Sequence, residues 1–316
     1  MRFVNELDVI VPIFNEEDCL ESFYHSLKTQ LLKINIPHKI IFVNDGSQDR
    51  SQEILLDLAN LDKVVQIYEL SRNFGHQAAI TCGLHASTAN WVITMDGDGE
   101  HPPEMIPDMI ELANKGFDLI QTKRQTGQKA SAFKRLTSDA FYHVLRYITN
   151  TPILPGVGDF RLINRQVVDA LKKLPEHHLF LRGMIAWVGF RSTCLNYSPA
   201  QRMGGVSKYS LRKMGKLAMD AIYSFSLVPI ILSFMAGCLF IILSFVIGII
   251  GLSSSAIGNW QNLLIFLLLF CTGVILCAIG SVGYYAGLAF QQAKSRPNYI
   301  IRSTTNRKQN KKVKNA

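Results

Sequence analysis

A long stretch without charged residues limits what this chain can fold into. From Phe225 to Phe290 the sequence contains no Asp, Glu, Lys or Arg. The stretch is interrupted near 253–255 and 258–261, and each part exceeds the ~20 apolar residues that cross a bilayer. We therefore expect a hairpin of two transmembrane helices, at about 225–251 and 262–290. Two helices buried in a soluble protein are the alternative, but no remaining part of the chain could wrap them.

Positive charge lies on both sides of this stretch. Eight basic and no acidic residues follow Phe290, and they account for most of the formal net charge of +9. Apolar residues recur with helical spacing from Leu211, which predicts a juxtamembrane amphipathic segment at 201–224 and leaves 291–316 as a basic tail. The positive-inside rule then places both termini in the cytoplasm. Anionic lipid explains the basic tail beside a span, so we expect a membrane partner and no nucleic acid.

Residues 1–200 carry the signals of a separate domain, in which short apolar runs alternate with helical spacing. The runs are rich in Val and Ile, as strands buried on both faces are, and they are Asp8–Phe14, Lys39–Asn44, Val64–Leu70, Trp91–Met95 and Asp118–Thr122. Helical spacing appears near Glu16–Lys33, Gln52–Leu61, Gln77–Ser87 and Pro103–Lys115. A helix is also expected at Ala130–Ile148 and a strand at Asp159–Ile163. The alternation predicts an α/β fold with a mostly parallel sheet.

Acidic and amide side chains follow three of the predicted strands. Asn15 and Glu16 follow the first, Asn44 to Ser47 close the second, and Asp96 to Glu100 follow the fourth. Ligands of such sheets bind outside the carboxyl ends of the strands, so we expect one shared crevice. Taken singly, Asn15 or Ser47 can equally be a helix cap. The three strand ends together favour a binding site.

Asp96 and Asp98 suggest what binds there. Two carboxylates one residue apart repel each other unless a cation lies between them. A hard divalent metal takes oxygen ligands of this kind and can also bind a diphosphate. Cysteines in a CxxC pair, which would suggest structural zinc, do not occur. The sequence therefore predicts an Mg²⁺ or Mn²⁺ site at this edge of the sheet.

The motifs together resemble glycosyltransferase family 2, whose nucleotide-sugar-binding domain has the GT-A fold. The resemblance rests on Pro12-x-x-Asn15-Glu16, Asn44-Asp45-Gly46-Ser47, Asp96-x-Asp98-x-Glu100-His101-Pro102-Pro103-Glu104, Arg72-Asn73-Phe74-Gly75, Gly158-Asp159-Phe160-Arg161 and Ser207-Lys208-Tyr209. It covers about residues 5–300. With the hairpin, the pattern is similar to the polyprenyl-phosphate glycosyltransferases, with bactoprenol glucosyltransferases nearest and dolichol-phosphate mannose synthases more distant.

The resemblance implies roles for the matching residues. The nucleotide-sugar-binding residues would be Pro12, Asn15, Glu16, Asp45, Asp96 and Arg124. The metal ligands would be Asp96, Asp98 and Glu100, where the family commonly has Gln at the last position. The acceptor-phosphate residues would be Arg135, Ser138, Arg202 and Lys208. The catalytic residues would be Asp159, Arg202 and Lys208.

The resemblance also implies a reaction: inverting transfer of a hexose, glucose from UDP-glucose, to undecaprenyl phosphate for modification of a cell-envelope glycan. The enzyme would lie in the inner (plasma) membrane as a multi-pass protein. A phosphate monoester ionises a second time near pH ~6, so at pH 7 it is mostly a nucleophilic dianion. Asp159 could therefore orient the sugar, or act as a base as in relatives with hydroxyl acceptors. The sequence leaves both roles open.

Several alternatives remain open at this point. The donor could be GDP-mannose, UDP-N-acetylglucosamine or a UDP-aminoarabinose derivative. A processive polysaccharide synthase would carry a Gln-x-x-Arg-Trp element and more spans, and neither is present. A different class is an inactive membrane scaffold that retains the nucleotide fold.

Two expectations concern partners of the hairpin. The glycines of Gly283-x-x-x-Gly287 permit close helix packing, either within the hairpin or between subunits of a homo-oligomer. The spans contain no acid or base that would mark a transport path. We therefore expect a separate flippase to move the product across the membrane.

Overall fold

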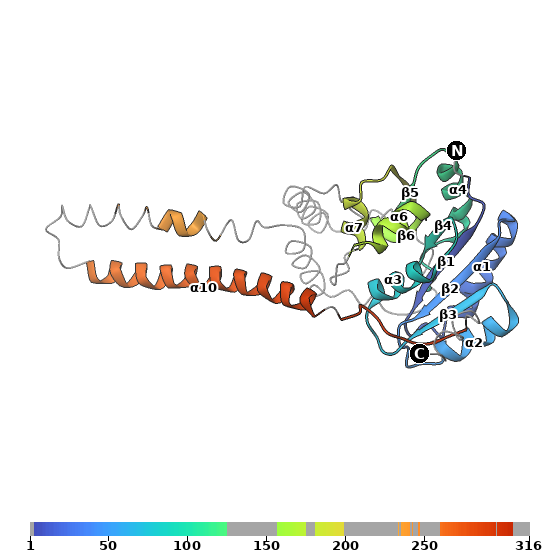
Figure 1. Cartoon of the computed structure of the whole chain (residues 1–316), viewed down its shortest axis with the longest axis horizontal. Coiled ribbons are helices and arrows are strands. Elements are labelled where there is room, and N and C mark those ends of the chain that lie inside the picture. Colours follow the sequence, from blue (N-terminus) through green and yellow to red (C-terminus); the bar gives the residue numbers. More distant parts are fainter. Residues whose placement is uncertain are drawn as a thin grey trace. The chain divides into compact units, whose positions relative to one another are not determined.

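The computed structural model describes two units of the chain (Figure 1). The described residues are 3–124, 157–174, 181–198, 233, 235–240, 242, 246, 260–294 and 296–305. The first unit takes in Met1–Arg146, Thr151–Tyr209 and Pro297–Ala316, and the second takes in Tyr147–Asn150 and Ser210–Arg296. The predicted helix at 130–148, the amphipathic segment at 201–224 and residues 306–316 lie outside the described residues.

The first unit contains the predicted alternation of strands and helices. Its first five strands are β1 (Leu7–Ile13), β2 (His38–Asn44), β3 (Val65–Leu70), β4 (Trp91–Thr94) and β5 (Leu119–Arg124). The helices between them are α1 (Leu20–Ile34), α2 (Ser51–Leu61), α3 (His76–Ala86), the 3₁₀ turn η1 (Pro103–Met105) and α4 (Ile106–Asn114). Every residue of β1 and β4 is buried, as the continuous apolar runs predict for central strands.

Further elements complete this unit, and most of them were not predicted. They are β6 (Val157–Asn164), α6 (Arg165–Lys172), α7 (Leu181–Trp187), β7 (Ser192–Tyr197) and β8 (Ile301–Thr304). The sheet order is β7-β5-β6-β4-β1-β2-β3-β8. Strands β1–β4 and β5/β7 pair in parallel, whereas β6 and β8 pair antiparallel with their neighbours. The predicted α/β fold with a mostly parallel sheet is confirmed.

The antiparallel strand β6 lies between β4 and β5 and determines where Asp159 emerges. Arg161 is in register with Thr94 of β4. The Thr94 hydroxyl donates to the Asp159 carbonyl, and the Thr122 hydroxyl donates to the Phe160 carbonyl at 2.8 Å. Because β6 runs opposite to β4, its beginning lies beside the carboxyl end of β4. Asp159 is therefore close to the turn that follows β4.

Helix α3 packs closely on the sheet and carries two residues of the site at its beginning. A Cβ atom added to Gly83 would lie 2.3 Å from Ile10 Cγ2 of β1, so only glycine permits this approach. The helix begins at His76, after Gly75 with φ +101°. This packing directs the first turn of α3 toward the carboxyl ends of the central strands.

Part of the segment predicted as a basic tail is the edge strand β8. Arg302 Nη1 lies 3.1 Å from Glu69 Oε1, and the Ser303 hydroxyl donates to the other oxygen of Glu69 at 2.6 Å. The Ile67 N–H donates to Thr305 Oγ1 at 2.9 Å. These contacts hold the segment that follows the apolar helix on the outer side of β3, which would otherwise expose an unpaired edge.

The second unit contains one long apolar helix, α10 (Trp260–Ala293). Its window Phe270–Gly287 has a mean hydropathy of 1.5 and no residue buried inside the structure, and it is the one candidate membrane span among the described residues. The predicted span at 262–290 lies within α10. A Cβ added to Gly283 or Gly287 meets no atom within 4 Å, so no described residue covers this glycine face.

The first predicted span, at 225–251, lies largely outside the described residues. Residues 235–240 are helical. The hydroxyls of Ser233 and Ser281 are 3.5 Å apart, and the rings of Phe240 and Phe270 pack with centroids 4.4 Å apart. Ser233 contacts the later residue Ser281 and Phe240 the earlier residue Phe270, so this segment runs antiparallel to α10. The contacts fit a hairpin, but a two-span membrane topology stays a prediction.

Candidate active site

The loops after β1 and β2 are tied together at the carboxyl edge of the sheet. The Asn15 N–H donates to Ser47 Oγ at 3.1 Å, and Asn15 Oδ1 accepts from the Gln48 N–H at 2.8 Å. Asn15 has φ 56°, a left-handed conformation that asparagine tolerates. Neither Asn15 nor Ser47 caps a helix, because the N-cap residues of α1 and α2 are Cys19 and Arg50. The two side chains thus hold neighbouring loops side by side.

Two other residues that the resemblance assigns to the nucleotide pocket lie next to these loops. Pro12 is buried within β1, where it is paired with Val43. Glu16 is half-buried, and its backbone N–H donates to Ser51 Oγ at 3.0 Å. Their contact with a nucleotide stays a prediction.

Asp45 holds the loop that leads into α3. Its two carboxylate oxygens accept from the N–H groups of Phe74 and Gly75 at 2.7 and 2.9 Å. Asp45 is 3% exposed, and its burial raises the pKa of the carboxyl although the two N–H groups oppose the shift. Asp45 therefore acts on the site by fixing the Arg72–Gly75 loop. The contact with a base or ribose that the resemblance implies stays a prediction.

Substituting alanine for Gly46 is expected to displace this loop. Gly46 has φ +68°, and an added Cβ would lie 2.6 Å from the Arg72 carbonyl carbon and 2.7 Å from Asn73 N. We expect Gly46→Ala to lower the free energy of unfolding by about 1–3 kcal/mol and to weaken nucleotide-sugar binding. Gly189→Ala is the control, because Gly189 has nearly the same φ, +69°, but the nearest atom to its added Cβ lies 3.9 Å away. Thermal unfolding of both variants compares them; equal losses would contradict the steric argument.

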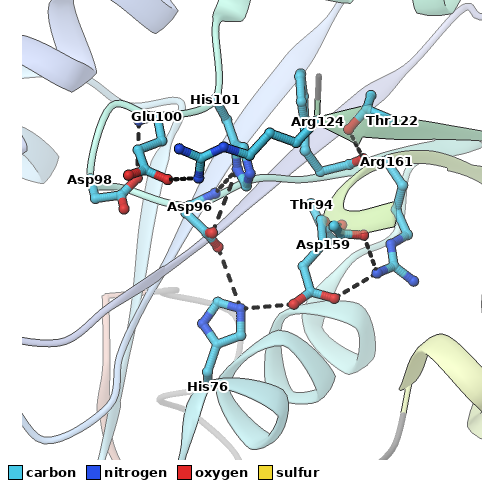
Figure 2. Close-up of polar contacts among 12 residues, drawn as sticks. His76, Thr94, Asp96, Asp98, Glu100, His101, Thr122, Arg124, Asp159 and Arg161 are labelled. Carbon is cyan, nitrogen blue, oxygen red and sulfur yellow. Dashed lines mark hydrogen bonds and ion pairs between the residues drawn. The ribbon is translucent and has the colours of Figure 1, made fainter. Parts of the chain in front are cut away.

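The predicted metal ligands lie on one tight turn after β4 (Figure 2). The Asp96 N–H donates to His101 Nδ1 at 2.8 Å, and the Glu100 N–H donates to Asp98 Oδ1 at 3.0 Å. Glu100 Oε2 forms an ion pair with Arg124 Nη1 at 2.8 Å. The carboxylates of Asp98 and Glu100 lie side by side, with the Arg124 side chain reaching them from β5. The structure thus places the three predicted metal ligands on one turn, but it pairs Arg124 with Glu100 and directs the Asp96 carboxylate toward His76.

The three predicted ligands do not form a ready-made metal site on this turn. In the part of the chain that the structure describes, no group of three or more His, Cys, Asp or Glu side chains is arranged to hold a metal. Glu100 is already neutralised by Arg124. Asp96 Oδ1 is buried and accepts no hydrogen bond, although His76 Nε2 lies 3.4 Å away. Mg²⁺ is often held by one or two carboxylates together with substrate phosphates. Asp96 and Asp98 are the carboxylates that could bind it in this way.

Asp159 is the centre of a second group of charges. Asp159 Oδ1 accepts from Arg161 Nη2 at 2.6 Å. Asp159 Oδ2 accepts from Arg182 Nη2 and Gln77 Nε2, each at 3.2 Å. The same oxygen lies 3.4 Å from His76 Nε2. Residues of β6, α7 and α3 therefore converge on one carboxylate that is 7% exposed.

His76 joins the two groups. Its Nε2 lies 3.4 Å from Asp96 Oδ1 and 3.4 Å from Asp159 Oδ2, and Figure 2 shows the ring below and between the two carboxylates. Partial desolvation opposes the charge on His76, whose side chain is still 42% exposed, but the hydrogen bond to Asp159 and the charges of both carboxylates raise its pKa to about 9. The imidazole is therefore charged at neutral pH.

The surroundings of Asp159 make it a weak base. Burial alone would raise the pKa of its carboxyl, but Arg182, His76 and Arg161 outweigh burial and hold that pKa well below its usual range. A general base works best with a pKa near the working pH. Asp159 is therefore better suited to orienting a ligand than to accepting a proton.

Sequence reasoning did not identify four residues around Asp159: His76, Gln77, Arg161 and Arg182. Arg161 stands within the quoted Gly-Asp-Phe-Arg motif, and His76 directly follows the quoted Arg-Asn-Phe-Gly motif, so a signal for these two was present. Arg182 belongs to a helix without such a motif. The predicted acceptor-phosphate and catalytic residues Arg135, Ser138, Arg202 and Lys208 lie outside the described residues.

Comparisons with known proteins identify the family of the chain. The model of "Glycosyl transferase family 2" matches residues 8–172. The uncharacterized glycosyltransferase YkcC of Bacillus subtilis (strain 168) is 38% identical over 304 residues, which cover 95% of this chain and 94% of that protein. The bactoprenol glucosyl transferase of Shigella phage SfX is 35% identical over 311 residues, which cover 94% and 99% of the two chains.

Solved structures resemble the chain less closely. The glucosyl-3-phosphoglycerate synthase of Mycobacterium tuberculosis, in complex with Mn²⁺, UDP and glucosyl-3-phosphoglycerate, is 18% identical, with a TM-score of 0.48 over 69% of this chain and 78% of that one. The family model covers more than half of this chain, and relatives above 30% identity span nearly all of it. The chain therefore belongs to glycosyl transferase family 2.

Proposed function

We propose that this protein is a metal-dependent, inverting hexosyltransferase that moves glucose from UDP-glucose to undecaprenyl phosphate at the cytoplasmic face of a bacterial inner membrane. Relatives named bactoprenol glucosyl transferase, from Shigella phages SfX and SfII, are 35% and 36% identical over at least 94% of this chain. The apolar helix α10 supports a membrane location. The meeting of Asp96 and Asp159 at His76 carries the proposal, because it joins a candidate cation-binding group to a candidate sugar-binding group.

The proposed reaction is one displacement at the anomeric carbon of the sugar. A phosphate oxygen of the acceptor forms a bond to this carbon, while the bond from the carbon to the donor diphosphate breaks. The electron pair of that bond leaves with the nucleoside diphosphate. The acceptor phosphate is mostly a dianion at pH 7, since its second ionisation lies near pH ~6, so the attack requires no proton removal. A single displacement turns an α-linked donor into a β-linked product.

The described side chains would orient and neutralise the two anionic substrates. Asp159, deprotonated and held by three cations, would accept from the donor sugar rather than take a proton. The side chains of His76 and Arg182 are 42% and 29% exposed, so these two cations can offset repulsion between the two substrates. A divalent metal on Asp96 and Asp98 would stabilise the charge that develops on the leaving diphosphate.

A donor panel tests this proposal. Detergent-solubilised protein is incubated with undecaprenyl phosphate and labelled UDP-glucose, GDP-mannose, UDP-N-acetylglucosamine or a UDP-aminoarabinose derivative. We expect label in the lipid fraction with UDP-glucose, and more slowly or not at all with the others. Transfer from another donor would correct the sugar alone. If no donor labels the lipid while the protein is folded, and Asp98→Ala leaves the cell's lipid-linked sugars unchanged, the inactive scaffold is favoured.

The proposed acceptor role of Lys208 gives a separate prediction. Lys208→Ala is expected to raise the KM for undecaprenyl phosphate about tenfold and the KM for UDP-glucose less than about twofold, because it removes a cation that we propose binds the lipid phosphate. Lys213→Ala is the matched control, since it removes one charge from the same predicted juxtamembrane segment. Similar losses in both variants would mean that Lys208 only attracts the protein to anionic lipid.

A further inference from the structure

Within the described part of the chain, the buried polar atoms without hydrogen-bond partners lie in or next to the cluster around Asp159. Among the described residues, four buried side-chain atoms have no hydrogen-bond partner: Gln77 Oε1, Asp96 Oδ1, Arg161 Nε and Arg161 Nη1. Gln77 and Arg161 donate to Asp159, and Asp96 is linked to it through His76. Native proteins satisfy nearly all buried polar atoms, so a concentration of exceptions calls for an explanation, such as a ligand or an ordered water that supplies the missing partners.

The orientation of the Gln77 amide follows from its partner. The deprotonated carboxylate of Asp159 can only accept hydrogen bonds, so the group that faces Oδ2 at 3.2 Å must be the Gln77 NH₂. The opposite orientation would place the amide oxygen against a carboxylate oxygen. Gln77 Oε1 is therefore held as an acceptor, buried and without a donor.

The two acceptors without a hydrogen bond differ in the chemistry of the group they could bind. Gln77 Oε1 is neutral and Asp96 Oδ1 is charged, and both side chains contact the small group formed by His76 and Asp159. A metal ion is drawn to the charged oxygen of Asp96 and only weakly to an amide. A neutral acceptor fixed beside Asp159, as Gln77 Oε1 is, suits an O–H donor instead, and a hexose presents several such groups.

We propose that Gln77 is a donor-specificity residue whose Oε1 accepts a hydrogen bond from one hydroxyl of the transferred hexose. This inference rests on the proposed glycosyl transfer and extends it, because it assigns recognition of the sugar to the first turn of α3. Asp159 orients the Gln77 amide through one hydrogen bond of 3.2 Å. Recognition of the sugar hydroxyl by Gln77 would therefore depend on Asp159.

The test is a cycle of variants and donor analogues. UDP-glucose is compared with its 2-, 3-, 4- and 6-deoxy analogues in the unsubstituted protein and in Gln77→Met, which keeps the side-chain length and removes the amide. Gln30→Met is the control, since Gln30 is half-buried on α1 and contacts Glu104. The kcat/KM for transfer to undecaprenyl phosphate and the Kd for each donor by calorimetry are both measured.

We expect one deoxy analogue to be about tenfold worse than UDP-glucose in the unsubstituted protein and in Gln30→Met, and less than twofold worse in Gln77→Met. Loss of the bond to Asp159 lowers the values for all five donors alike and cancels in this comparison. The same factor lost for every donor, or no loss at all, would overturn the inference, since Gln77 would then only support Asp159 or bind water. If the coupling appears in Kd while no lipid is labelled, the proposed acceptor fails and the role of Gln77 stands.

Discussion

Replacing Asp159 with asparagine is expected to reduce sugar transfer at least about a hundredfold and to lower the free energy of unfolding by about 3–5 kcal/mol. The side chain of Arg161 is 3% exposed and pairs with Asp159 at 2.6 Å, so the substitution leaves a buried guanidinium without its counter-ion. Arg182 and His76 lose the same partner. Transfer rates and thermal unfolding of the detergent-solubilised variant measure the two effects.

A second variant separates catalysis from stability. Asp159→Asn combined with Arg161→Met removes the buried charge together with its partner, and replacing both members of a buried ion pair is often nearly neutral. We expect the double variant to regain much of the lost stability and to remain inactive. Recovery of transfer in the double variant would show that Asp159 matters only because it neutralises Arg161, and would contradict its proposed role in orienting the sugar.

Asp98→Asn, in contrast to Asp159→Asn, is expected to abolish transfer with little effect on stability. Asp98 is half-buried, and its Oδ1 accepts from the Glu100 N–H at 3.0 Å. Asparagine keeps an oxygen for this bond, so we expect the free energy of unfolding to fall by less than about 1 kcal/mol. The negative charge proposed to hold a divalent cation is lost. We expect kcat/KM to fall about a hundredfold or more in both Mg²⁺ and Mn²⁺.

Asp57→Asn provides the control, because Asp57 lies exposed on α2 away from this turn. It makes the same change of one charge and should leave transfer unaltered. Binding of Mn²⁺ in the presence of UDP, followed by electron paramagnetic resonance, should weaken in Asp98→Asn and not in Asp57→Asn. Unchanged turnover of Asp98→Asn in either metal would show that the metal assignment is wrong.

The strands and the edge of the sheet that binds ligand could be predicted because their signals are local. Continuous apolar runs such as Trp91–Met95 are typical of strands buried on both faces, and β4 lies at Trp91–Thr94. The acidic turn from Asp96 to Glu100 follows such a strand directly, so its place at the carboxyl edge follows from the chain itself. The apolar composition of 262–290 predicts a long helix for the same reason.

The group around Asp159 could not be predicted, because its members are brought together by packing over long separations in the chain. Gln77 is 82 residues from Asp159 and Arg182 is 23 residues away. Their contact depends on β6 running antiparallel between β4 and β5, and on Gly83 letting α3 approach β1. No local pattern encodes either arrangement. The pairing of β8 (Ile301–Thr304) with the sheet could not be predicted either, because a four-residue strand in a basic segment has almost no sequence signal.

The sequence by itself determined the strands β1 to β5 and the helices between them, where the acidic turn stands and that the segment at 262–290 is apolar enough for a bilayer. These properties depend on neighbours in the chain and on side-chain periodicity. Only the tertiary structure decided that Asp159 is a permanently charged, weakly basic carboxylate, that His76 links it to Asp96, and that Gln77 presents an unpartnered oxygen. The charge and the free hydrogen-bonding capacity of a buried group depend on its neighbours. Those neighbours come from elements far apart in the sequence, so only the tertiary structure determines them.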